Sequence, residues 1–139
     1  MISKEQWQTI EKNLSDRIFH KESFTLDGHT ILVSKTFVSK NKLGIAVYID
    51  GVIQMAQAEQ SRPEFNQVTH KVWRKRQKAV YSPVKVKKLI KDLGKRRAKE
   101  FFPNLEKVIT YYDPTFTSAT SLVRQFKKLD GLSVVNQTE

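Results

Sequence analysis

The residues best suited to chemistry are lysines and arginines gathered in the second half of the chain. Residues 71–99 hold thirteen Lys or Arg and one acid, Asp92, a net charge of +12. The remaining residues carry twelve basic and thirteen acidic side chains, so the whole excess of +11 lies in this one segment. Such a density of ammonium and guanidinium groups creates a directed positive field, and it favours a polyanion such as nucleic acid as the ligand.

Twelve of these cations are candidate phosphate contacts. Like charges at helical spacing repel, and almost no acids offset them here, so a bound polyanion would relieve the repulsion. We therefore predict that this surface binds DNA or RNA phosphates with little base specificity. The candidates are Lys71, Arg74, Lys75, Arg76, Lys78, Lys85, Lys88, Lys91, Lys95, Arg96, Arg97 and Lys99. Tyr81, inside the same segment, is the aromatic side chain best placed to stack on a base.

Other interpretations of the basic segment stay open. It could be a solvated lysine-rich face that binds nothing, or a surface that docks on an acidic protein. A membrane surface is less favoured, because an interfacial helix needs exposed apolar side chains that the core requires here. Gly94 joins two expected helices, as in a helix-turn-helix unit, and the second would begin with Lys95 and Arg96.

Catalytic and metal-binding patterns are absent from the sequence. His20, His29 and His70 lack metal-ligand spacing. There is no phosphate-cradling glycine loop, nucleophile elbow or paired-carboxylate motif. The acids that could best meet a divalent metal are Asp50, Glu59 and Glu64, although turn and helix-start positions explain two of them. The sequence predicts a non-catalytic protein without metal or other cofactor.

Composition limits the class of protein. The chain has 139 residues, the usual size of one domain, and no cysteine, which excludes disulfides and thiolate chemistry. The first residues show no apolar run typical of a signal peptide, and no stretch approaches the roughly 20 apolar residues of a membrane span. We expect a cytoplasmic protein that does not contact membranes.

The pattern of apolar, capping and turn residues predicts an α+β fold, whose helices and strands position these cations. Ser3 and Gln6 form a capping box before an amphipathic helix at 4–20. A meander sheet of three or four antiparallel strands follows at 22–56, with hairpin turns at Asp27-Gly28 and Asp50-Gly51. The N-terminal helix should cover one face of this sheet.

The C-terminal half is expected to be largely helical. Apolar residues from Phe65 to Val80 repeat at helical spacing, and Ser82-Pro83 begins a helix with a buried stripe at Val86, Leu89, Ile90 and Leu93. Together with a short helix at 95–102, these make a basic helical segment at 61–102. A strand at 106–112 and a helix at 118–130 complete one domain at 1–131, before a polar tail at 132–139.

Three stretches, VWRKRQKAVYSP, LIKDLGKRRAKEFFPNL and ITYYDPTFTSATSLVRQF, resemble small uncharacterised proteins of tailed phages and prophages. The likeness covers roughly residues 70–127 and carries no assigned catalytic residue. It implies expression in a bacterial host cytoplasm. It also implies a choice among a DNA-handling factor, a virion component and an inhibitor of host defence, such as an anti-CRISPR protein. Such an inhibitor would bind a host protein or ribonucleoprotein complex.

Overall fold

The computed structural model describes residues 2–135; residue 1 and residues 136–139 lie outside this range. The predicted α+β class is confirmed. Two compact units make up the chain: unit 1 comprises Met1–Arg74 with Tyr112–Glu139, and unit 2 comprises Lys75–Tyr111. No helix within the described residues is long and apolar enough to cross a membrane.

Unit 1 is built on an antiparallel sheet of five strands. Its centre is the expected meander, β1 (Lys21–Leu26), β2 (His29–Ser39) and β3 (Lys42–Ile49). Two short strands complete the order β6-β3-β2-β1-β7, namely β6 (Thr115–Phe116) and β7 (Ser133–Val134). The predicted tail at 132–139 therefore includes the strand residues Ser133 and Val134, while its last four residues lie outside the described range.

The expected hairpin turn at Asp27-Gly28 is confirmed. Asp27 and Gly28 both have positive φ, 51° and 81°, as a two-residue hairpin turn of the I′ type requires. The meander has three strands, the smaller of the two numbers expected, and no further strand follows the Asp50-Gly51 turn before Met55. Val52 forms only a single bridge with Ile49, and Met55 begins the 3-10 helix η1 (Met55–Ala58). The edge of β3 is occupied by the chain near Pro114, whose carbonyl accepts from the Val47 amide at 2.8 Å.

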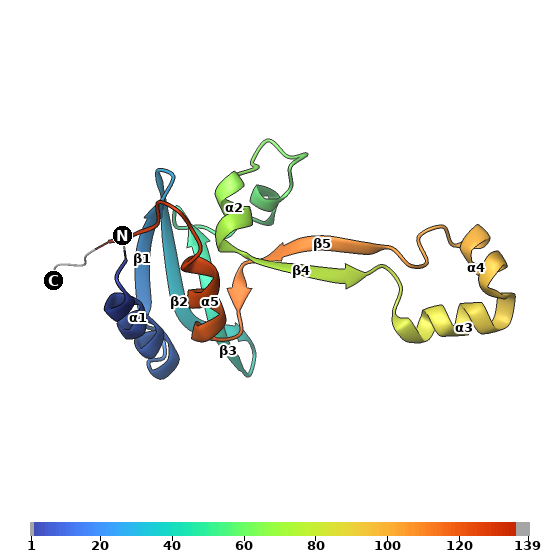
Figure 1. Ribbon diagram of the computed structural model, residues 1–139, viewed down its shortest axis with the longest axis horizontal. Coiled ribbons are helices and arrows are strands. Elements are labelled where there is room, and N and C mark those ends of the chain that lie inside the picture. Colours follow the sequence, from blue (N-terminus) through green and yellow to red (C-terminus); the bar gives the residue numbers. More distant parts are fainter. Residues whose placement is uncertain (1, 136–139) are drawn as a thin grey trace. The chain divides into compact units, whose positions relative to one another are not determined.

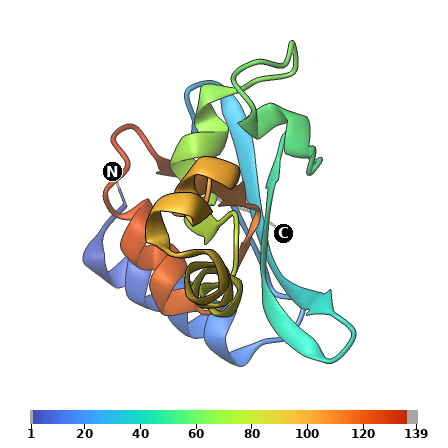
Figure 2. The same cartoon turned by 90° about the vertical axis from the view of Figure 1, so that its right-hand side faces the viewer.

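Two helices lie side by side on one face of this sheet (Figures 1 and 2). The first, α1 (Lys4–Asp16), has the predicted capping box, and α5 (Ala119–Phe126) is capped by Ser118. Between them and the sheet, the Phe24 ring stacks on Trp7 at 5.9 Å and meets Phe126 edge to face at 5.6 Å. These contacts form the core of unit 1.

The N-terminal helix is shorter than expected. It ends at Asp16 rather than near residue 20, and Ile18, within the range expected to be helical, is 50% exposed. The cause is a backbone bond to the sheet, because the Phe19 amide donates to the Lys35 carbonyl at 2.7 Å. The Phe19 amide therefore cannot donate to a carbonyl of the helix, and the helix ends before it.

The helix expected from Phe65 to Val80 is only partly correct. Helix α2 (Gln67–Val72) is capped by Asn66, and the next six residues form strand β4 (Arg74–Ala79). Val72 and Trp73 are buried in unit 1, so the apolar spacing predicted the burial correctly. The change to a strand depends on a partner strand about thirty residues later in the sequence, which local periodicity cannot reveal.

Unit 2 consists of most of a two-stranded ribbon and two helices. Strand β4 pairs with β5 (Val108–Asp113), and the two run in opposite directions (Figure 1). Helices α3 (Pro83–Leu93) and α4 (Lys95–Phe101) connect them and pack on each other. The expected buried stripe of α3 is wrong, because no residue of this helix is buried. Only Ala98 and Leu105 are buried within unit 2.

Candidate nucleic-acid interface

The positive charge of the chain is concentrated in unit 2. Its 37 residues, Lys75–Tyr111, include twelve Lys or Arg and three acids, a net charge of +9, whereas the rest of the chain carries thirteen basic and eleven acidic residues, or +2. All twelve basic side chains of unit 2 are exposed. Repulsion among them is not offset by a large core, because so few residues of the unit are buried.

Two of the twelve predicted phosphate contacts belong to unit 1 and have carboxylate partners there. The Lys71 ammonium lies 2.8 Å from Asp27, and the Arg74 guanidinium donates to Asp113 at 3.0 Å. The side chain of Arg74 is only 25% exposed. These two residues therefore hold parts of the fold together, and the other ten form the candidate interface within unit 2.

The first part of this interface is the ribbon. Because side chains alternate along a strand, Arg76 and Lys78 lie on one face of β4 and Lys75 on the other. The Arg76 guanidinium lies over the ring of Tyr111 on the paired strand, 5.7 Å from its centroid. Both faces of the ribbon thus carry cations, and they lie on a strand where the sequence pattern had predicted a helix.

Lys107 is an exposed cation of unit 2 that lies outside the predicted phosphate contacts. It lies outside the basic segment in sequence, but its carbonyl accepts from the Val80 amide at 3.0 Å. The ribbon therefore brings Lys107 to the end of β4, on which Lys75 and Lys78 lie. Only the pairing of two distant stretches could have revealed this position. Lys87, on α3, is a further exposed cation of the unit.

Helix α3 positions the second part of the interface. Its predicted start is confirmed, since the Ser82 hydroxyl accepts from the Lys85 amide at 3.2 Å and Pro83 opens the first turn. Lys85, Lys88 and Lys91 follow at spacings of three, close to one helical turn. They therefore project along one side of α3.

Tyr81 lies at the junction of ribbon and helix. The Lys85 ammonium is 5.3 Å from the centre of its ring, and the Phe102 ring meets it edge to face at 5.9 Å. Tyr81 is partly buried. Its ring therefore already packs within unit 2, at the site where the sequence predicted stacking on a base.

Helix α4 supplies Lys95, Arg96, Arg97 and Lys99. A helix-turn-helix unit has three to four residues between its helices, whereas only Gly94 separates α3 from α4. That prediction does not fit this geometry. Two ion pairs are present, Arg96 with Glu100 at 3.5 Å and Lys99 with Glu106 at 3.6 Å. Both are largely exposed, so they contribute little and can open for a phosphate.

Most of the remaining cations have no acidic neighbour. Within the described part of the chain, no carboxylate lies at ion-pair distance from the following side chains of unit 2. They are Lys75, Lys78, Lys85, Lys87, Lys88, Lys91, Lys95, Arg97 and Lys107. This charge is available to an external polyanion.

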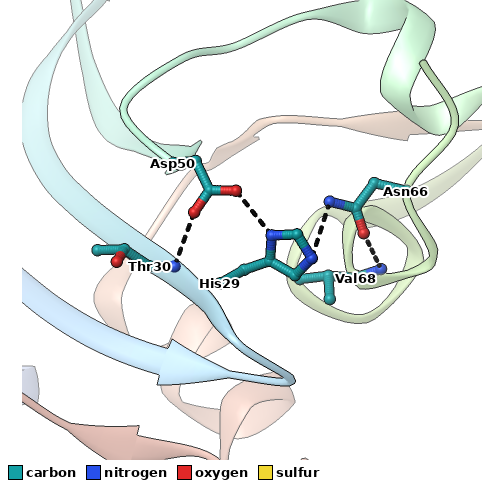
Figure 3. Close-up of polar contacts among 5 residues, drawn as sticks. All are labelled: His29, Thr30, Asp50, Asn66 and Val68. Atoms are coloured by element: carbon teal, nitrogen blue, oxygen red, sulfur yellow. Dashed lines mark hydrogen bonds and ion pairs between the residues drawn. The ribbon is translucent and has the colours of Figure 1, made fainter.

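A separate polar cluster surrounds His29 in unit 1 (Figure 3). Its Nδ1 is 2.7 Å from the Asp50 carboxylate, whose other oxygen accepts from the Thr30 amide at 2.9 Å. The Asn66 amide nitrogen is 3.4 Å from Nε2, and the Asn66 oxygen accepts from the Val68 amide at 3.0 Å. The hydrogen bond from His29, then that from Thr30, lowers the pKa of Asp50.

The His29 cluster resembles an acid–base pair, but its bonds favour a structural role. Asn66 must donate to Nε2, because its oxygen is used by α2, and so Nδ1 carries the proton that Asp50 accepts. Both ring nitrogens are thus occupied. A cavity of about 510 Å³ lies beside the ring, lined by Asp27, Glu64 and residues 65–68. The cluster connects the residues at the Asp27-Gly28 and Asp50-Gly51 turns with the start of α2.

Three of the other side chains weighed as metal ligands each contact a different partner. His20 lies 2.8 Å from Glu22, and His70 stacks on Tyr112 with ring centres 4.0 Å apart. Glu59 pairs with Arg62 at 3.2 Å. Among residues 2–135, no three His, Asp or Glu side chains are grouped as a metal ion would require.

Comparisons of the chain with protein-family models, with curated proteins and with solved structures gave no significant match.

Proposed function

We propose that this chain is a non-catalytic nucleic-acid-binding protein, an accessory protein of the phage type, which contacts phosphates through unit 2. The observation that carries the proposal is the net charge of +9 on 37 residues whose basic side chains are all exposed. A surface of this kind gains free energy from the release of counterions when it neutralises phosphates.

The elements of unit 2 suit a nucleic-acid backbone. Both an α-helix and a two-stranded ribbon have dimensions that a DNA groove accepts, and both occur here with cations on their surfaces. Lysine predominates, with nine of the twelve basic residues. Lysine acts as a point charge on a flexible stem, whereas reading of guanine typically uses the arginine fork. Binding should therefore depend weakly on base sequence.

A test compares two variants that lose the same charge. Replacing Lys75, Lys78, Lys88 and Arg97 by Gln removes four cations of unit 2, and replacing Lys4, Lys12, Lys127 and Lys128 by Gln removes four from unit 1. The first variant should lose more than about tenfold in affinity for a DNA or RNA oligonucleotide at low salt, and the second should stay near the parent. Equal losses in both variants, or none, would contradict the assignment to unit 2.

The second candidate function is inhibition of a host defence complex by binding a protein or ribonucleoprotein. The observation in its favour is apolar exposure within the same unit, where Val84 is 78% and Phe101 68% exposed. Single exposed apolar residues are ordinary, but several beside unpaired cations fit a protein partner with an acidic surface. Capture of a host protein that survives nuclease treatment, and is lost in Val84→Ser/Phe101→Ser, would favour this function over the first.

A further inference from the structure

Unit 1 also carries exposed aromatic side chains that are not part of its core. Phe19 and Phe37 are 57% and 53% exposed, and their rings meet edge to face at 6.4 Å. Leu43, which is 39% exposed, lies directly opposite Phe37 on the neighbouring strand. These three side chains form what we call the aromatic patch. It continues the apolar face of the sheet beyond the end of α1.

Phe19 is held in a backbone conformation that does not suit it. Its φ is +63°, in the left-handed region, where residues other than Gly, Asn and Asp are strained. Backbone bonds fix this conformation, since the Phe19 amide donates to the Lys35 carbonyl and the Lys35 amide donates to the His20 carbonyl. The ring is more than half exposed, so its packing offsets little of the backbone strain, and such strain gathers at functional sites.

The surroundings of the aromatic patch are basic. The two stretches that carry it, residues 16–22 and 35–43, contain five basic residues and two acids. One of the acids, Glu22, already pairs with His20. Lys35 lies on the same face of β2 as Phe37, and Lys40 and Lys42 stand at the adjoining turn. A ligand that offers flat apolar rings and negative charge matches this arrangement.

We propose that the aromatic patch binds unpaired bases of a nucleic-acid strand, with the neighbouring lysines on its phosphates. This inference deepens the proposed function and rests on it. Bases stack on exposed aromatic rings whatever their sequence, but only where base pairing leaves their faces free. The patch would therefore add preference for single-stranded or looped nucleic acid to the charge attraction of unit 2.

The test uses Phe19→Asn and Phe37→Thr, singly and together, in the full chain. Asparagine tolerates the left-handed conformation and threonine suits a strand, so both variants should fold at least as stably as the parent. Met55→Gln is the control, because Met55 is a 55% exposed apolar residue elsewhere in unit 1. Affinities are measured by fluorescence anisotropy for a single strand of about 15 nucleotides and for a duplex of the same length.

The double variant should bind the single strand about tenfold or more weakly than the parent, bind the duplex within about twofold, and melt no lower. An unchanged affinity for the single strand, or an equal loss on single strand and duplex, would overturn the inference. So would conversion of a parental dimer into a monomer by Phe19→Asn, seen by sedimentation, because the patch would then join two copies.

The variant that lacks Lys75, Lys78, Lys88 and Arg97 separates base stacking by the patch from phosphate binding by unit 2. If that variant alone loses binding, the proposed function stands and the aromatic patch plays no part. Failure of the parent to bind either oligonucleotide would overturn both.

Discussion

The guanidinium of Arg74 donates to the carboxylate of Asp113 at 3.0 Å, where β4 begins and β5 ends. Asp113 also accepts from the Thr115 amide and hydroxyl, at 2.9 and 2.6 Å. The sequence placed Arg74 among the phosphate contacts, yet its side chain is only 25% exposed and that of Asp113 only 17%. The pair therefore belongs to the fold, and its removal should affect stability before it affects binding.

Arg74→Ala should lower the free energy of unfolding by about 1–2 kcal/mol, because it leaves a mostly buried carboxylate without this partner. Urea denaturation followed by Trp fluorescence measures the change. Lys78→Ala is the control, since Lys78 is exposed on the same strand, and it should leave stability unchanged. Equal stability of the two variants would contradict the structural role of Arg74.

The stability of unit 1 should depend on pH through Asp50. Its pKa is lowered in the folded state, chiefly by the hydrogen bond from His29. The stabilisation is therefore complete above the unfolded pKa of about 3.9 and is lost as the pH falls through the folded value. Asp50→Asn keeps a residue that tolerates the positive φ of 52° at this turn.

We expect the parent to be more stable than Asp50→Asn by about 1 kcal/mol near neutral pH, a modest value because the carboxylate is 51% exposed. The difference should vanish at acid pH, below the folded pKa. Thermal unfolding at a series of pH values measures it, with Asp130→Asn as the control for an exposed acid. A difference that persists at the lowest pH would mean that charge on Asp50 is not the cause.

Substitutions of Tyr81 distinguish two roles for its ring, packing within unit 2 and stacking on a base. Its ring contacts Lys85 and Phe102 within unit 2. Tyr81→Phe keeps these ring contacts and should preserve both stability and affinity. Tyr81→Ala should lower the stability of unit 2 by about 1–2 kcal/mol, less than at a fully buried position, and with it the order of α3. If Tyr81→Ala instead keeps the parental stability and weakens oligonucleotide binding alone, the ring stacks on a base.

Local signals in the sequence were sufficient for many element boundaries. The capping box of Ser3 and Gln6, the Asp27-Gly28 turn and the Ser82-Pro83 helix start all occur as predicted. Each is a contact between residues no more than three positions apart, so the sequence contains the whole interaction. The α+β class follows from the same kind of information.

Distant pairings explain what the sequence could not predict. Residues 74–79 form a strand only because residues 108–113 pair with them, and the two-residue strands β6 and β7 are too short for a periodic signal. The same limit applies to the candidate interface. Its charge was predictable from composition, whereas the partners of Lys71 and Arg74, and the inclusion of Lys107, depend on tertiary contacts.

Hydrogen exchange should distinguish the two units. Unit 2 buries only Ala98 and Leu105, and a two-stranded ribbon is marginally stable in water, so its amides should exchange through low-energy openings. Amides of β2 and β3, which carry the buried Ile31 and Ile45, should exchange far more slowly. Mass spectrometry of peptides measures both rates. A bound oligonucleotide should slow exchange in unit 2, and equal protection of the two units in the free protein would contradict this account.

The most direct test of phosphate binding by unit 2 is its dependence on salt. Fluorescence anisotropy of the nuclease-treated protein with single- and double-stranded DNA and RNA is measured between about 50 and 200 mM salt. If the surface engages about six or more phosphates, affinity should fall by about a thousandfold across that range, and the Lys75, Lys78, Lys88 and Arg97 variant should show a shallower slope. Absence of binding at the lowest salt, or binding that is insensitive to salt, would contradict the account.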